Sequence, residues 1–238
     1  MKFKNYLNES RSVSMPKKKA IDEIGNKCLN NLRFFYKKKE WLFRGINNTS
    51  NFLFVDPTKG KPRRSANIDT NYYTLLIDNL PSWKEYPLRS RSIVCSTSEE
   101  YASDYGEVYI VIPYDNANIA IASEDDLWDS FKFGSLGLFN DYLKYLFREH
   151  DLKVSNNNYQ SLKNALIWLN DNNIVDYDKY NIFNSDKDVM KSLDKLMSPD
   201  YNGFKLGLKN MKENREVWIQ GKAILIHDNI FWDIIDEI

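Results

Sequence analysis

The chain of 238 residues has few cysteines and histidines and no long apolar run. Its two cysteines, Cys28 and Cys95, lie far apart without a CxxC spacing, so neither a disulfide framework nor a structural zinc site is expected. His150 and His227 are the only histidines, which argues against a mechanism that needs a histidine base together with a second histidine. No apolar run approaches the roughly 20 residues that a membrane-spanning helix needs. We therefore expect a soluble protein of a reducing compartment, without a metal or a membrane partner.

The chain also lacks an excess of charge of either sign. Lys+Arg and Asp+Glu number 33 each, so no global basic field steers the chain onto nucleic acid or anionic lipid. Hydrophobic residues make up 42% and aromatic residues 14%, which argues against a disordered chain. The length favours one domain, which we place at residues 17–238.

Residues 1–16 are expected to be a leader or flexible tail. They are basic but lack the apolar core of a secretory signal, and a loosely docked terminus is the default for such a segment. The first nine residues, MKFKNYLNE, resemble the head-targeting leaders of internal capsid proteins in large tailed phages. A prohead protease cuts such leaders after Leu-x-Glu or Ile-x-Glu, and Leu7-Asn8-Glu9 fits that pattern. The resemblance implies a virion internal protein.

Hydrophobic periodicity predicts an α+β domain. Helical spacing predicts one helix over 17–40, a loop is expected at 47–71, and short helices are expected at 72–80 and 99–106. Val, Ile and Tyr content predicts strands at 41–45, 92–98, 107–113, 118–123, 215–220 and 222–234. The segment of about 125–200 is helical and is interpreted as an insertion.

Three short motifs at or near strand ends are candidates for chemistry. Arg44, in Phe-Arg-Gly at 43–45, could bind a phosphate with its planar fork, or could be a surface arginine beside a turn. The hydroxyls of Ser-Thr-Ser at 96–98 could orient a ligand, or could cap the next helix. Glu216 stands in a strand otherwise built for burial, so it needs either a partner or a solvent-facing position.

The order of these motifs resembles the R-S-E class of mono-ADP-ribosyltransferases, which includes bacterial toxins and phage-encoded enzymes. The matching stretch runs from about 41 to 219, and the segment 102–113 is also in the style of that family. The resemblance implies split mixed sheets packed around an NAD cleft, with an N-terminal helix and a helical insertion at about 125–200.

The resemblance also implies a role for each motif residue. Arg44 would hold the NAD pyrophosphate and ribose, with Gly45 beside it. Ser96 would brace the nicotinamide ribose and the catalytic glutamate, while Thr97 and Ser98 shape the strand. The catalytic glutamate would be Glu216, which would stabilise the oxocarbenium-like centre as nicotinamide leaves, without a metal.

Three further residues are expected to bind the acceptor. Asn214 stands two residues before Glu216, where members of the family carry Glu or Gln. Tyr201 and Phe204 precede it, in the region where these enzymes place a substrate-facing aromatic. Two arginine pairs, at 63–64 and 89–91, fit either solvated loops or phosphate contacts.

The expected activity is transfer of ADP-ribose from NAD to a macromolecular acceptor, with release of nicotinamide. We expect a host protein as the acceptor, in the host cytoplasm during phage infection, and a nucleic-acid acceptor stays open. The alternative is a non-enzymatic internal head protein that binds and inhibits a host factor.

Overall fold

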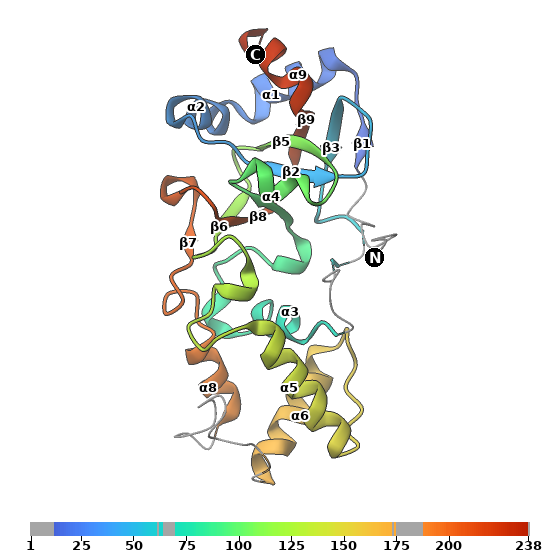
Figure 1. Ribbon diagram of the computed structural model, residues 1–238, viewed down its shortest axis with the longest axis vertical. Helices are drawn as coiled ribbons and strands as arrows, with labels where there is room; N and C mark the ends of the chain where they lie inside the picture. Colours follow the sequence, from blue (N-terminus) through green and yellow to red (C-terminus); the bar gives the residue numbers. More distant parts are fainter. Residues whose placement is uncertain (1–11, 61, 64–69, 173, 175–187, 238) are drawn as a thin grey trace. The chain divides into compact units, whose positions relative to one another are not determined.

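The computed structural model describes residues 12–60, 62–63, 70–172, 174 and 188–237 (Figure 1). The chain divides into two compact units, the first made of residues 1–63, 86–125 and 206–238, and the second of 64–85 and 126–205. The longer segment of the second unit has nearly the boundaries that we predicted for the insertion. All three strands that carry the candidate motifs belong to the first unit.

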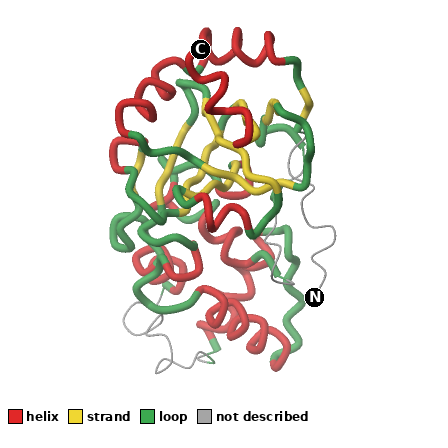
Figure 2. Tube along the Cα trace, turned by 45° about the horizontal axis from the view of Figure 1, so that its top comes forward, coloured by secondary structure: helices red, strands yellow, loops and turns green. Residues whose placement is uncertain are grey.

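The strands form one antiparallel sheet, shown in yellow in Figure 2. Among the described residues its order is β1-β3-β9-β5-β2-β4-β8-β6-β7. The strands are β1 (Val13–Ser14), β2 (Phe43–Ile46), β3 (Phe52–Val55), β4 (Ile93–Ser96), β5 (Glu107–Pro113), β6 (Asn118–Ile121), β7 (Lys205–Leu206), β8 (Glu216–Gln220) and β9 (Ala223–His227).

The α+β class is confirmed, but the prediction of split, mixed sheets is wrong. β2 pairs with β5 along Phe43–Ile46, whereas it pairs with β4 only where Phe43 faces Ser96. This single pair is enough to continue the hydrogen-bonded order from β5 through β2 into β4 and β8. The strands of Arg44 and Ser96 are therefore joined through a single residue pair.

The helices of the first unit differ in two places from the predicted ones. The helix expected over 17–40 is interrupted at Cys28, whose φ of −125° is not helical. The Asp115 carboxylate accepts the backbone N–H groups of Asn30 and Asn31 and so stabilises a new helix start there. The strand expected over 222–234 ends at His227, whose Nδ1 accepts the Asn229 N–H and caps a helix. The helical segments are α1 (Lys17–Lys27), α2 (Leu29–Lys38), η2 (Arg89–Arg91), α4 (Glu99–Ser103), η4 (Leu208–Asn210), α9 (Asp228–Ile234) and η5 (Ile235–Glu237).

Two segments that we expected to be irregular contain strands. The expected loop at 47–71 includes β3, which pairs with β9 along its whole length. The expected tail at 1–16 includes β1, in which Val13 and Ser14 pair with β3. The proposed cleavage motif at 7–9 lies outside the described residues.

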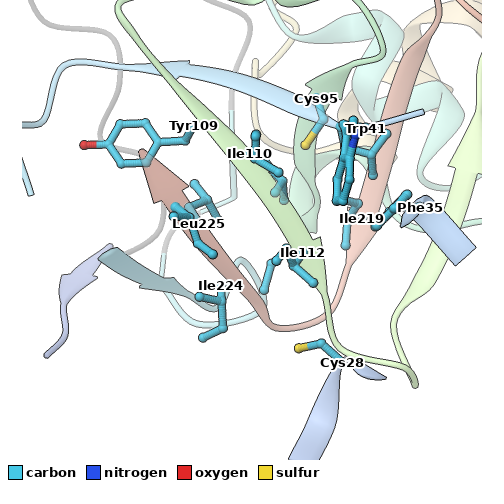
Figure 3. Close-up of a cluster of buried hydrophobic side chains, with 14 of the residues drawn as sticks. Cys28, Phe35, Trp41, Cys95, Tyr109, Ile110, Ile112, Ile219, Ile224 and Leu225 are labelled. Carbon is cyan, nitrogen blue, oxygen red and sulfur yellow. The ribbon is translucent and has the colours of Figure 1, made fainter. Parts of the chain in front are cut away.

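The core of the first unit lies between the sheet and the helices α1, α2 and α9. Ile24, Phe35 and Phe231 come from these helices and are fully buried, as are Ile112 and Leu225 of the sheet. Figure 3 shows Phe35, Ile112 and Leu225 among the buried side chains of this cluster. Full burial of such a side chain contributes roughly 1.5–3 kcal/mol relative to exposure. This core includes residues of β5 and β9, and β5 pairs directly with β2, the strand of Arg44.

The second unit is helical and has its own core. Fully buried Phe204 packs edge-on against Trp83 at 4.9 Å and lies 5.6 Å from Phe131, between ring centroids. Its helical segments are α3 (Tyr72–Ile77), η1 (Pro81–Trp83), η3 (Leu127–Asp129), α5 (Leu136–Glu149), α6 (Tyr159–Asp171) and α8 (Val189–Leu196). Of the helices that the structure describes, none is long and apolar enough to cross a membrane.

Candidate functional site

Arg44, Ser96 and Glu216 lie on three neighbouring strands, in the order β2-β4-β8. Ser96 is the direct cross-strand partner of Glu216 and also faces Phe43, the residue before Arg44. Directly opposed residues of an antiparallel pair project to the same face of the sheet. The register thus places Ser96 and Glu216 on one face of the sheet with Phe43, whereas Arg44, the next residue of β2, projects to the opposite face.

Glu216 is a buried carboxylate with strong donors around it. Its residue is 7% exposed, and its Oε1 atom lies 3.2 Å from Nη2 of Arg89. The same oxygen accepts a hydrogen bond from the indole Nε1–H of Trp218. The backbone of Glu216 is fixed as well, because its N–H donates to Glu124 and its carbonyl accepts from Ala122. The carboxylate is therefore held in one place on the face of β8.

Arg89 also belongs to this site, although its contact with Glu216 was not predicted from the sequence. It lies on η2, its side chain is 6% exposed, and its guanidinium carbon stands 5.6 Å from the centroid of the Trp218 ring. The available signal was the arginine pair at 89–91 just before a strand. That signal could not name Glu216 as the partner, since the contact depends on how β4 and β8 pair.

Arg44 is a buried cation close to this carboxylate. Its Nη1 donates to the Val94 carbonyl at 2.8 Å. Burial lowers the pKa of the Arg44 guanidinium to about 9, and the nearby Arg63 lowers it too, while the negative charge of Glu216 opposes the shift. A group with this pKa stays protonated at neutral pH. The site therefore combines a fixed carboxylate with fixed positive charge, an arrangement that can stabilise charge formed during a reaction.

Gly45 has a structural reason to be glycine. A Cβ built on it would lie 2.0 Å from the backbone oxygen of Ala102, in α4, and 2.9 Å from Cβ of Tyr105. No side chain fits that space, so glycine lets α4 approach β2. The predicted role of Gly45 in cofactor binding is not needed to explain its presence.

The hydroxyls at 96–98 are all engaged in local structure. Ser96 Oγ accepts the Ser98 N–H at 2.9 Å, and Ser98 Oγ accepts the Tyr101 N–H as the N-cap of α4. Thr97 Oγ1 accepts the Arg215 N–H at 2.8 Å, which ties the end of β4 to the residue before Glu216. The alternative of a helix cap is thus confirmed for Ser98, and the predicted contacts with NAD stay predictions.

The three predicted acceptor-binding residues are not brought together by the described contacts. Asn214 is exposed and has a left-handed φ of 52° at the turn before β8. Tyr201 and Phe204 belong to the second unit. Tyr201 is half exposed, with Lys132 Nζ 4.5 Å from its ring centroid. The full burial of Phe204 in the aromatic core does not fit contact with a macromolecular acceptor.

A hollow in the first unit lies among other residues. It has a volume of about 520 Å³ and is lined by polar residues of the turns after β3, β5 and β8 and by the end of α1, including Lys27, Asp56, Tyr114, Asp115 and Lys222. None of the motif residues lines it. The motif residues are the stronger candidates, because Glu216 is a buried carboxylate paired with Arg89 and its charge interacts with the Arg44 guanidinium.

The described part of the chain contains no group of three or more His, Cys, Asp and Glu side chains arranged to hold a metal ion. No family model matches the chain, and no curated protein or solved structure is significantly similar to it. Arg44, Ser96 and Glu216 therefore remain the candidate functional residues on the ground of their geometry.

Proposed function

We propose that the chain transfers ADP-ribose from NAD to a macromolecular acceptor, expected to be a host protein, and releases nicotinamide. The protein would act in the host cytoplasm during phage infection. It would enter the host cell from the phage head if its leader is cleaved as the sequence predicts. NAD is a substrate in this reaction, and no metal takes part.

The observation that carries the proposal is the cross-strand pair of Ser96 and Glu216, with Arg44 on the strand next to Ser96. These are the three residues that the motif order nominates. A catalytic carboxylate has to be fixed beside the centre where positive charge develops, and Glu216 is fixed by its backbone and by two side-chain donors.

The proposed reaction replaces one bond at ribose C1′ by another. The bond from C1′ to the nicotinamide nitrogen breaks, and its electron pair leaves with nicotinamide. A nucleophilic atom of the acceptor then bonds to C1′ and gives up its proton. Between these two events the ribose carries positive charge, which Glu216 would stabilise. Arg44 would supply positive charge for the diphosphate.

The test is incubation of a host-cell lysate with the protein and isotope-labelled NAD, followed by mass spectrometry. The proposal predicts a labelled ADP-ribose adduct on a discrete acceptor, with an equivalent amount of free nicotinamide. A digest of the nucleic-acid fraction, analysed in parallel, distinguishes a base from a protein side chain. Absence of an adduct in both fractions contradicts the proposal.

A non-enzymatic role has one specific observation in its favour. Glu216 is already ion-paired with Arg89, and Arg44 donates to the main chain at Val94. Charged groups engaged in this way suit a chain that keeps the fold and binds a host factor without catalysis. Stable capture of one host protein, without NAD and without an adduct, is the result that this alternative predicts.

A further inference from the structure

The contact between Arg89 and Glu216 is built from three side chains that brace one another. Arg89 and Trp218 both donate to Oε1 of Glu216, and the guanidinium of Arg89 also lies 5.6 Å from the Trp218 ring centroid. All three residues are at least nine-tenths buried. Two donors that meet at one oxygen fix the direction of the carboxylate as well as its position.

The turn that carries Arg89 is itself fastened to the strand of Glu216. The Leu88 N–H donates to Oε1 of Gln220, which ends β8. Within the turn, Ser92 Oγ donates to the Leu88 carbonyl and the Ser92 N–H donates to the Arg89 carbonyl. The guanidinium therefore starts from a backbone that is anchored to the same strand as its partner.

We infer that Arg89 is a positioning residue for Glu216: it holds the carboxylate in one direction on the face of β8. The inference rests on the proposed function for its link to catalysis, and on the contacts alone for its link to Glu216. Removing one partner from a buried ion pair leaves the other charge without compensation. Without Arg89, the carboxylate would lose one of the two donors that meet at Oε1, and with it the geometry of its bond with the Trp218 indole.

A direct readout of this arrangement is the indole N–H resonance of Trp218. The chain has six tryptophans, so a sample labelled with 15N-tryptophan gives six indole signals. Trp218→Phe assigns the one that belongs to Trp218, and Glu216→Gln shows where it moves when its carboxylate acceptor is lost. This readout reports on the site whether or not the protein consumes NAD.

The test compares Arg89→Gln with Arg89→Lys and with a matched control, Arg91→Gln. Arg91 lies on the same turn, but its Nη1 donates to the Gly60 carbonyl. Arg89→Gln is expected to move the Trp218 resonance toward its Glu216→Gln position and to lower kcat about tenfold or more, with the KM for NAD changed by less than about threefold. Arg89→Lys is expected to restore most of kcat, and Arg91→Gln to leave the Trp218 resonance in place.

An unmoved Trp218 resonance in folded Arg89→Gln overturns the inference, as does a loss that appears in KM rather than in kcat. If Arg89→Gln does not fold, Arg89→Met replaces it, since methionine keeps an apolar stem over Trp218. If neither Arg89→Gln nor Arg89→Met folds, Arg89 has a role in stabilising the fold, and the inference is overturned as well. If the unsubstituted protein releases no nicotinamide, the proposed function fails, and the resonance alone decides whether Arg89 positions Glu216.

Discussion

Ser96 and Glu216 face each other across the antiparallel pair β4–β8, and the buried guanidinium of Arg89 contacts the carboxylate of that pair. The three residues come from a strand end, a strand start and a turn, which places them on separate segments of the first unit. Their convergence depends on the register of β4 with β8. A slip of that register by one residue would turn Glu216 to the opposite face of the sheet.

Gly45 provides a test of the packing of α4 on β2. Gly45→Ala is expected to lower the free energy of unfolding by about 1–3 kcal/mol, because the added Cβ meets the rigid backbone oxygen of Ala102. Gly25→Ala is the matched control, since nothing lies within 4 Å of a Cβ at that position in the exposed face of α1. It is expected to raise the free energy of unfolding by about 0.5–1 kcal/mol. Urea denaturation of the two variants measures both values, and equal effects would contradict the close approach of α4.

The two cysteines are expected to be unreactive in the folded protein. Burial raises the pKa of both thiols, Cys28 and Cys95, from the ordinary 9.0 to about 12. A raised pKa keeps the thiol protonated, so at pH 8 the thiolate population is lower than in the unfolded chain by roughly a thousandfold. Alkylation by iodoacetamide at pH 8, followed by mass spectrometry, should therefore require denaturant. Rapid labelling of either cysteine in native buffer would show that its surroundings are open.

Sequence reasoning succeeded where a local signal decides the structure. The strand predicted at 107–113 is β5 with the same bounds, because a continuous Val, Ile and Tyr run is buried whichever strands flank it. The break at Cys28 was not predictable from spacing, since it depends on the Asp115 carboxylate, which arrives from a distant turn. β3 was missed because Phe52–Val55 is a short apolar segment within a polar stretch.

The same distinction applies to the candidate site. Arg44, Ser96 and Glu216 could be nominated one by one from strand ends and motif order. The pairing of Glu216 with Arg89 could not, because it follows from the register of β8 and from the anchoring of η2 to Gln220. Phe204 was nominated by its distance from Glu216 along the chain, whereas its burial is set by Trp83 and Phe131 in the second unit.

The turn before β8 depends on the left-handed backbone of Asn214. Asparagine tolerates its φ of 52°, whereas a β-branched residue does not, so Asn214→Val is expected to cost about 1–2 kcal/mol. Glu213→Val is the matched control, because Glu213 is also exposed and is not among the described residues with positive φ. Thermal unfolding followed by circular dichroism compares them. A cost for Glu213→Val as large as that for Asn214→Val would remove the backbone explanation.

The most direct test of the central claim is the rate of nicotinamide release from NAD by the unsubstituted chain and by Glu216→Gln. Circular dichroism and a rise in melting temperature on addition of NAD establish that the variant is folded and binds NAD. Because glutamine cannot supply negative charge to the ribose, the account predicts a fall in the rate of about a hundredfold or more. A folded, NAD-binding Glu216→Gln that keeps nearly the full rate would contradict the assignment of Glu216 as the catalytic carboxylate.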